Sequence, residues 1–140
     1  MRFFLLILSM LFYFFSCAID YADTRLEIYN NSTINIYVQE DRDTTQLLPH
    51  AKIGFVLPQY LIKSGAFIRM KKPGSKIAWE SYINNTPDKK LHLYVFSEDT
   101  LIKYTTEQII EGKRYLKRVD ISLKELKANN WKVIYTNTVR

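Results

Sequence analysis

The sequence predicts a mainly β domain of the α+β class, an antiparallel sheet or β-sandwich with two short helices in a single domain. Three observations predict it. Short segments alternate apolar and polar side chains with the period of a β-strand, and turn-forming residues separate them. Only two segments carry helix caps, and each is too short for the crossover of a parallel βαβ unit. A small ferredoxin-like α+β fold is the alternative.

The first half of the domain is predicted as strands and turns. Leu26–Asn30 and Ile34–Gln39 alternate β-branched and aromatic residues around a turn-prone Asn-Ser-Thr, which predicts a hairpin. Glu40–His50 is polar and is expected to be a loop. Further strands are predicted at Lys52–Leu57, at Ala66–Lys72 and, running into a loop, at Lys76–Asn85.

The second half alternates strand and helix patterns. Lys90–Ser97 places apolar side chains on one face and His92, Tyr94 and Phe96 on the other, as expected of a central strand that is covered on both faces. Thr105 with Gln108 predicts a helix at 106–111, and Ser122 with Glu125 a second at 123–129. Strands are expected at Arg114–Ile121 and Trp131–Thr136. The predicted core residues are Leu91, Leu93, Val95, Leu116, Ile121, Leu126, Trp131, Val133 and Tyr135.

The N-terminus carries an export signal. Phe3–Phe15 is an apolar, uncharged run that contains one serine, Ser9, and it is shorter than the ~20 residues of a membrane-spanning helix. The only cysteine, Cys17, follows Ser16 at the position where a signal peptidase would cut, and a lone cysteine cannot form an internal disulfide. We therefore expect a lipoprotein-type signal at 1–16, a lipidated Cys17 with a tether at 17–24, and a globular domain at 25–140. Ordinary cleavage after Ala18 and an uncleaved single anchor are the alternatives.

The charge of the chain argues against nucleic-acid binding. The formal net charge is +6, with 20 Lys and Arg residues against 14 Asp and Glu residues. The cations are scattered among acidic residues, which is typical of a solvated surface, whereas a nucleic-acid footprint requires a concentrated basic patch.

Little in the sequence indicates catalysis. His50 and His92 are the only histidines, and with Cys17 lipidated no motif with metal-ligand spacing is left, so no metal and no cofactor is expected. The pairs Glu98/Asp99 and Asp41/Asp43 resemble the carboxylates of a hydrolase. Their positions at a strand end and in a loop favour turn and capping roles.

Two features indicate a binding surface. Lys117 and Arg118 lie in a basic stretch, although strand alternation sends the two side chains to opposite faces. Trp79, with Trp131 and ten tyrosines, would form an aromatic platform for sugars if its ring were exposed. A solvated face and a packed core are the structural alternatives.

The phrases LYVFSEDTLIKY, YLKRVDISLKEL and NNWKVIY, with IYNNSTINIYV and the Trp79-Glu80 pair, resemble a family of small Bacteroidetes lipoproteins of unknown function. The chain departs from that pattern at Thr106, Val119 and Thr136. The resemblance implies an envelope location and a compact domain, but no catalytic residue. It also implies possible O-glycosylation at Thr44 and Thr100, which lie in Asp-Thr motifs.

These observations predict a lipid-anchored cell-envelope protein, held to the outer membrane on its periplasmic or outer side. A non-enzymatic binding or interaction module is favoured, because the polar residues occupy turns and helix caps and form no recognisable reactive group. Its expected partners are the membrane, through the lipid, and an envelope protein or polysaccharide. An envelope hydrolase that uses loop carboxylates and a protective, immunity-like or inhibitor-like lipoprotein are the alternatives.

Overall fold

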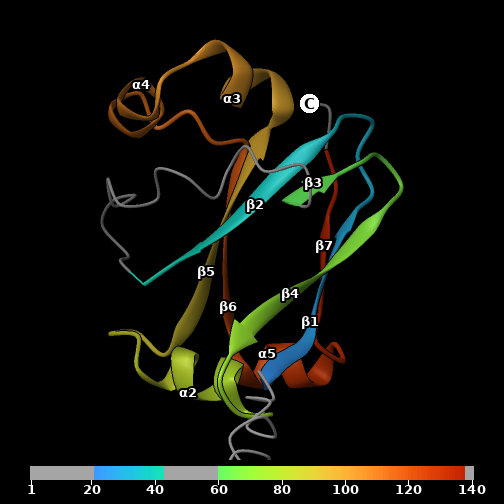
Figure 1. Ribbon diagram of the computed structural model, residues 1–140, viewed down its shortest axis with the longest axis vertical. Helices are drawn as coiled ribbons and strands as arrows, with labels where there is room; N and C mark the ends of the chain where they lie inside the picture. Colours follow the sequence, from blue (N-terminus) through green and yellow to red (C-terminus); the bar gives the residue numbers. More distant parts are fainter. Residues whose placement is uncertain (1–20, 43–59, 138–140) are drawn as a thin grey trace, which may run out of the picture.

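The computed structural model describes residues 21–42 and 60–137 (Figure 1). This part of the chain contains seven strands and four short helices. The strands are β1 (Ala22–Asn30), β2 (Ile36–Asp41), β3 (Leu61–Ile62), β4 (Phe67–Pro73), β5 (Lys90–Ser97), β6 (Lys117–Ser122) and β7 (Lys132–Tyr135). The helices are α2 (Ala78–Asn84), α3 (Glu98–Lys103), α4 (Thr106–Glu111) and α5 (Leu123–Ala128).

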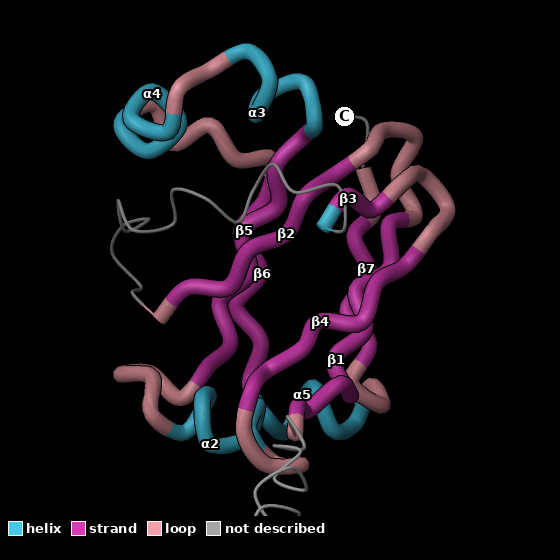
Figure 2. Tube along the Cα trace, viewed as in Figure 1, coloured by secondary structure: helices cyan, strands magenta, loops and turns pink. Residues whose placement is uncertain are grey.

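The strands form two sheets, which Figure 2 shows facing each other. One sheet has the order β4-β1-β7, and the other has the order β3-β2-β5-β6. Every strand pair is antiparallel except β1 and β7, which run parallel. The predicted fold class, a mainly β α+β domain with short helices, is therefore confirmed.

The main core fills the space between the two sheets. Leu26 and Ile28 from β1 pack in one cluster with Leu91 and Leu93 from β5, and all four are at most 1% exposed. The α2 helix closes one end of this core with Trp79. A smaller cluster on the outer face of β5 is covered by α3 and α4. It contains Tyr37, Tyr94, Phe96, Leu101 and Ile109.

The predicted hairpin between the first two strands is wrong. β1 pairs with β4 and β7, whereas β2 pairs with β3 and β5, so the connection carries the chain from one sheet to the other. Asn30 holds this crossing. Its buried amide donates to the carbonyls of Ile34 and Ile62 at 2.8 and 2.9 Å, and its Oδ1 accepts from the amide of Ser32.

The strand predicted at Lys76–Asn85 is also wrong, because α2 occupies most of it. Trp79, Tyr82 and Ile83 are all buried, and their i, i+3, i+4 spacing is that of one helix face. The α3 helix was not predicted. It begins at Ser97, whose hydroxyl accepts the amide of Thr100 at 3.1 Å.

The two helices predicted from capping boxes are confirmed. In α4 the Thr105 hydroxyl accepts the Gln108 amide, and the Gln108 side chain accepts the Thr105 amide. Ser122 and Glu125 make the same reciprocal pair at the start of α5. Side-chain caps of this kind satisfy backbone donors that have no partner within the helix.

Three smaller expectations also need comment: two differ from the structure, and one lies where the structure is not described. β1 begins at Ala22, so the strand takes in part of the predicted tether at 17–24. Leu116 is 44% exposed and is not a core residue, because it lies just before β6. The strand predicted at Lys52–Leu57 lies outside the described residues.

Candidate functional site

Trp79 does not form a sugar platform. It is 0% exposed, and its indole N–H donates to the Met70 carbonyl at 3.4 Å inside the core. Trp131 is only 9% exposed. Both tryptophans are packed as in the core alternative, and neither offers the exposed ring face that a sugar ring must reach.

The carboxylate pair Glu98/Asp99 lies in the first turn of α3, where negative charge is favoured by the helix dipole. Glu98 also accepts a hydrogen bond from the Asn35 amide at 2.8 Å. Thr100 is in the same turn, and its hydroxyl contacts that of Ser97 at 2.7 Å. The cap of α3 is Ser97, so Glu98, Asp99 and Thr100 lie in the first turn beside the cap rather than forming it.

Several predicted site residues lie outside the described residues. They are Cys17, Asp43, Thr44 and His50.

Lys117 and Arg118 do not share one surface. Lys117 is exposed at the start of β6, while Arg118 turns to the opposite face and donates from Nε to Asp120 Oδ1 at 2.7 Å. The Arg118 guanidinium also lies 5.6 Å from the ring centre of Tyr94. The two cations therefore do not act as a pair toward one ligand.

His92 is the centre of a polar cluster on the outer face of the four-stranded sheet. Its Nδ1 lies 2.7 Å from Asp120 Oδ1, and its Nε2 lies 2.9 Å from Asp88 Oδ1. The side chain is 0% exposed, whereas Asp88 and Asp120 are 36% and 39% exposed. Cross-strand register places Asp41, His92 and Asp120 in one row.

The carboxylates of this cluster are held in the ionised form. Burial raises the pKa of Asp120, but hydrogen bonds from His92 and Arg118 outweigh it, and the pKa lies below its ordinary value. Burial likewise raises the pKa of Asp88, but the hydrogen bond and charge of His92 and the backbone amides of Lys90 and Asp88 together outweigh it, so the pKa is lowered. With both ring nitrogens engaged and no exposed surface, His92 holds two carboxylates together rather than meeting a substrate.

A second network ties β1 to α2 and α5. Asp23 is 2% exposed and accepts Arg25 Nε and Nη2 at 2.9 and 2.7 Å and the Trp79 amide at 3.1 Å. Arg25 Nη1 donates to Glu80 at 3.0 Å, and Lys127 donates to the other oxygen of Glu80 at 3.1 Å. Each charged group in this network is paired with another residue of the same domain, so the network stabilises the end of the sandwich.

Trp131 completes this network from the α5–β7 turn. The Arg25 guanidinium lies 4.1 Å from the centre of a Trp131 ring, close enough for a cation–π contact. Trp131 and Asn130 both have positive φ, of 61° and 52°, which few non-glycine residues adopt. The Trp131 backbone amide donates to the Leu126 carbonyl at 2.7 Å, and the Trp131 carbonyl accepts the Glu27 backbone amide at 2.9 Å. These two hydrogen bonds fix the turn on both sides.

An exposed apolar row lies on the outer face of the three-stranded sheet. Tyr29 is paired with Phe67 on β4 and with Ile134 on β7, so the three side chains form one cross-strand row, here named the Phe67 row. Phe67 is 46% exposed and Ile134 is 55% exposed. Tyr29 and Phe67 stack, with ring centres 4.9 Å apart and planes inclined by 17°.

Charged residues border the Phe67 row. The adjacent row pairs Glu27 with Arg69 on one side and with Lys132 on the other. Arg69 donates to Glu27 at 3.0 Å, and the Lys132 amine lies 5.6 Å from the Tyr29 ring centre. Two cations and one carboxylate therefore border the apolar row, and the exposed Lys71 follows two residues after Arg69 on the same face of β4.

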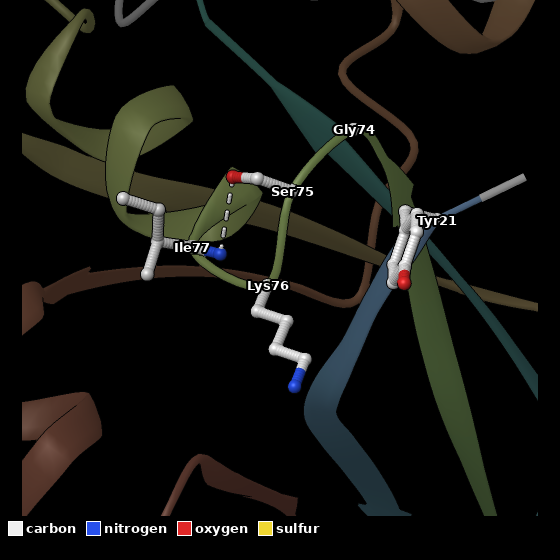
Figure 3. A pocket seen from close by; sticks show the side chains of 5 residues that line it. All are labelled: Tyr21, Gly74, Ser75, Lys76 and Ile77. Atoms are coloured by element: carbon white, nitrogen blue, oxygen red, sulfur yellow. Dashed lines mark hydrogen bonds between the residues drawn. The ribbon is translucent and has the colours of Figure 1, made fainter.

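An open hollow lies at the start of β1 (Figure 3). Its volume is about 520 Å³, and it is lined by Tyr21, Gly74, Ser75, Lys76 and Ile77. Tyr21 and Ile77 are 56% and 54% exposed. The Tyr21 carbonyl accepts the Gly74 amide at 2.8 Å, which holds the strand start against the β4–α2 turn.

Within residues 21–42 and 60–137, no three His, Cys, Asp or Glu side chains are grouped so that they could hold a metal ion. In the same part of the chain, no helix has the length and apolar character needed to cross a membrane. Comparison with known protein families, with curated proteins and with solved structures finds no significant match to this chain.

Proposed function

We propose that this protein is a non-enzymatic binding module of the cell envelope, held there by a lipid on Cys17, and that the Phe67 row is its binding surface. The observation that carries the proposal is the exposure of Phe67 and Ile134 beside Tyr29 on the outer face of a sheet. The described helices lie at the two ends of the sandwich (Figure 1). Exposed apolar patches rimmed by polar residues are typical of protein interaction sites.

The partner best matched to this surface is an acidic protein segment. Phe67 and Ile134 offer apolar contact, while Arg69 and Lys132 place positive charge in the adjacent row, and Lys71 lies further along the same face of β4. The Phe67 ring stacks on Tyr29, so one face of each ring is already covered and less aromatic face is left for a sugar ring. Three strands span only about 10 Å between the outer two, so the contact is small and of the transient class.

The geometry of the polar residues supports a non-enzymatic role. His92 is fully buried between two carboxylates, and Glu98 and Asp99 lie in the first turn of a helix. A general acid or base must reach the proton that it transfers, and none of these three side chains lines the hollow beside Tyr21 and Ile77.

The anchor rests on the sequence. Cys17 follows a short apolar segment and is the only cysteine, and the resemblance to envelope lipoproteins implies the same location. Because one acyl chain gives only weak attachment, at ~0.8 kcal/mol per buried CH₂, stable anchoring requires the several chains of a mature lipoprotein. Cys17→Ala should therefore leave the chain unprocessed or release it from the membrane fraction. A processed, membrane-bound variant would contradict the anchor.

The binding surface is tested by affinity capture of envelope proteins with the purified processed protein, at low and high salt. We compare Phe67→Ser and Ile134→Ser with Ile102→Ser, which removes a 74% exposed isoleucine from α3. The proposal expects a defined partner that is lost with the first two variants and retained with the third. Charge reversal at Lys132 should weaken capture most at low salt, because exposed charges are screened beyond about 8 Å at physiological ionic strength.

The same experiment distinguishes a protein partner from a polysaccharide ligand. Binding to an acidic polysaccharide array, with no protein captured, would show that the surface serves a glycan and would reject the acidic protein partner. Capture that is equally strong for Phe67→Ser and Ile102→Ser would reject the Phe67 row as the binding surface.

A further inference from the structure

We propose that the end of the sandwich that carries Tyr21, Lys76 and Ile77 lies against the membrane interface, with the side chains of Tyr21 and Ile77 among the lipid headgroups. The inference rests on the proposed lipid at Cys17. It adds an orientation: this end contacts anionic phospholipid, and the Phe67 row points away from it.

The chain length between the lipid and the fold sets the first limit. Tyr21 is the first described residue, four positions after Cys17. At the ~3.5 Å per residue of a fully extended chain, Tyr21 lies at most about 14 Å from the lipidated residue. A segment this short keeps the nearest end of the domain beside the headgroups.

The surface at that end has the composition of a membrane interface contact. Tyr21 and Ile77 are more than half exposed on either side of the hollow. Lys76 lies between them, and in Figure 3 its amine extends away from the ribbon. Tyrosine is enriched at the membrane–water boundary, and a lysine near an anionic lipid surface is attracted to it.

The contact is also rigidly placed on the fold. The Gly74 amide donates to the Tyr21 carbonyl at 2.8 Å, and the Ile77 amide donates to the Ser75 hydroxyl at 3.3 Å. Gly74 has a φ of 123°, a conformation that side chains other than glycine rarely adopt, so the turn needs this residue. Tyr21 and Ile77 therefore approach a bilayer as one surface.

This orientation leaves the Phe67 row free for a partner. β1 runs from Ala22 at the membrane end to Asn30 at the other end (Figure 1). Tyr29 is seven residues after Ala22, about 23 Å along the strand at 3.3 Å per residue. The row is thus beyond the headgroups, where a second envelope protein can reach it.

The experiment measures the depth of a fluorophore on the lipidated full-length product in vesicles of phosphatidylethanolamine and phosphatidylglycerol. Lipidation consumes the thiol of Cys17, so an introduced cysteine is the only labelling site. We label Ser75→Cys at the hollow and, as the control, Ile102→Cys on α3, and measure quenching by lipids that carry a nitroxide near the headgroup. We expect several-fold stronger quenching at position 75 than at position 102.

A second set of variants tests the named side chains. In the Ser75→Cys background, Lys76→Glu with Ile77→Ser should reduce quenching at position 75. Equal quenching at positions 75 and 102, or no effect of this double substitution, would overturn the proposed contact. Mass spectrometry of the N-terminal peptide from the same sample distinguishes two kinds of failure. If the lipid is present, a negative result rejects only the proposed orientation. If the lipid is absent, it rejects the lipid anchor and, with it, the orientation.

Discussion

Neutralising Asp23 is the sharpest test of how the fold holds the end of the sandwich where β1 meets α2 and α5. Asp23 is 2% exposed and accepts hydrogen bonds from the backbone amides of Arg25 and Trp79 and from the Arg25 guanidinium. Asp23→Asn preserves the side-chain shape but removes the charge, and its NH₂ group cannot accept from Arg25. Breaking a buried ion pair by removing one partner costs ~3–5 kcal/mol.

The expected cost lies below that range, because Arg25 is not fully buried. Its side chain is 36% exposed, and it keeps Glu80 at 3.0 Å. We expect a loss of about 2 to 3 kcal/mol in the free energy of unfolding, a fall in Tm of roughly 8 to 12 °C for a domain of this size. Urea unfolding followed by tryptophan fluorescence measures it. As a control, Lys127→Met, which removes a half-exposed cation, should cost less than about 1 kcal/mol.

The same variant predicts a pH dependence. Burial raises the pKa of Asp23, but hydrogen bonds from Arg25 and from the Trp79 amide outweigh it, so the folded-state pKa lies below the ordinary value of 3.8. A lowered folded-state pKa stabilises the fold above the unfolded-state pKa, and this stabilisation is lost as the pH falls through the folded-state value. The difference between wild type and Asp23→Asn should be complete at pH 7 and shrink below about pH 4. A stability difference under about 0.5 kcal/mol at pH 7, or one that grows in acid, would refute the reasoning.

Three further predictions concern stability and use the same urea assay. Leu93→Ala should cost ~2–5 kcal/mol, because the side chain is 1% exposed, and Leu116→Ala less than about 1 kcal/mol, because its side chain is 44% exposed; similar costs would contradict the placement of Leu116. His92→Ala should cost about 2 to 4 kcal/mol through lost packing and the unpaired carboxylates of the cluster, and a cost below about 1 kcal/mol would show that the cluster is not structural. Ser122→Ala should cost ~1 kcal/mol by removing the cap of α5, while an unchanged midpoint would argue against the capping box.

Local patterns in the sequence predicted the local structure well. The capping boxes at Thr105 and Ser122 predicted α4 and α5, because a cap is decided by residues three positions apart. The alternation in Lys90–Ser97 predicted a strand covered on both faces, and the two core clusters lie on its opposite sides. The prediction failed where two local patterns disagreed. The aromatic residues in Ala78–Asn84 favour a strand by propensity, but the segment forms a helix that buries one face.

The sequence could not predict which distant strands pair with each other. Nothing local distinguishes a hairpin after Asn30 from a crossing between sheets, since the choice depends on Asn30 meeting the carbonyl of Ile62. The Phe67 row was missed for the same reason. Tyr29, Phe67 and Ile134 become neighbours only through the register of β4 and β7 on β1. Alternation within Phe67–Lys71 does carry a partial signal, because it places Phe67 on the same face as two cations.

The central claim, that the Phe67 row is where a partner binds, is tested most directly by site-specific photocrosslinking in intact cells. A photoreactive phenylalanine analogue replaces Phe67 in one strain and Ile102 in another, and both chains keep Cys17 and the signal segment. The account predicts one discrete crosslinked protein from position 67, with an acidic segment at the crosslinked site, and none from position 102. The same product from both positions, or none from position 67 with the protein correctly lipidated, would contradict it.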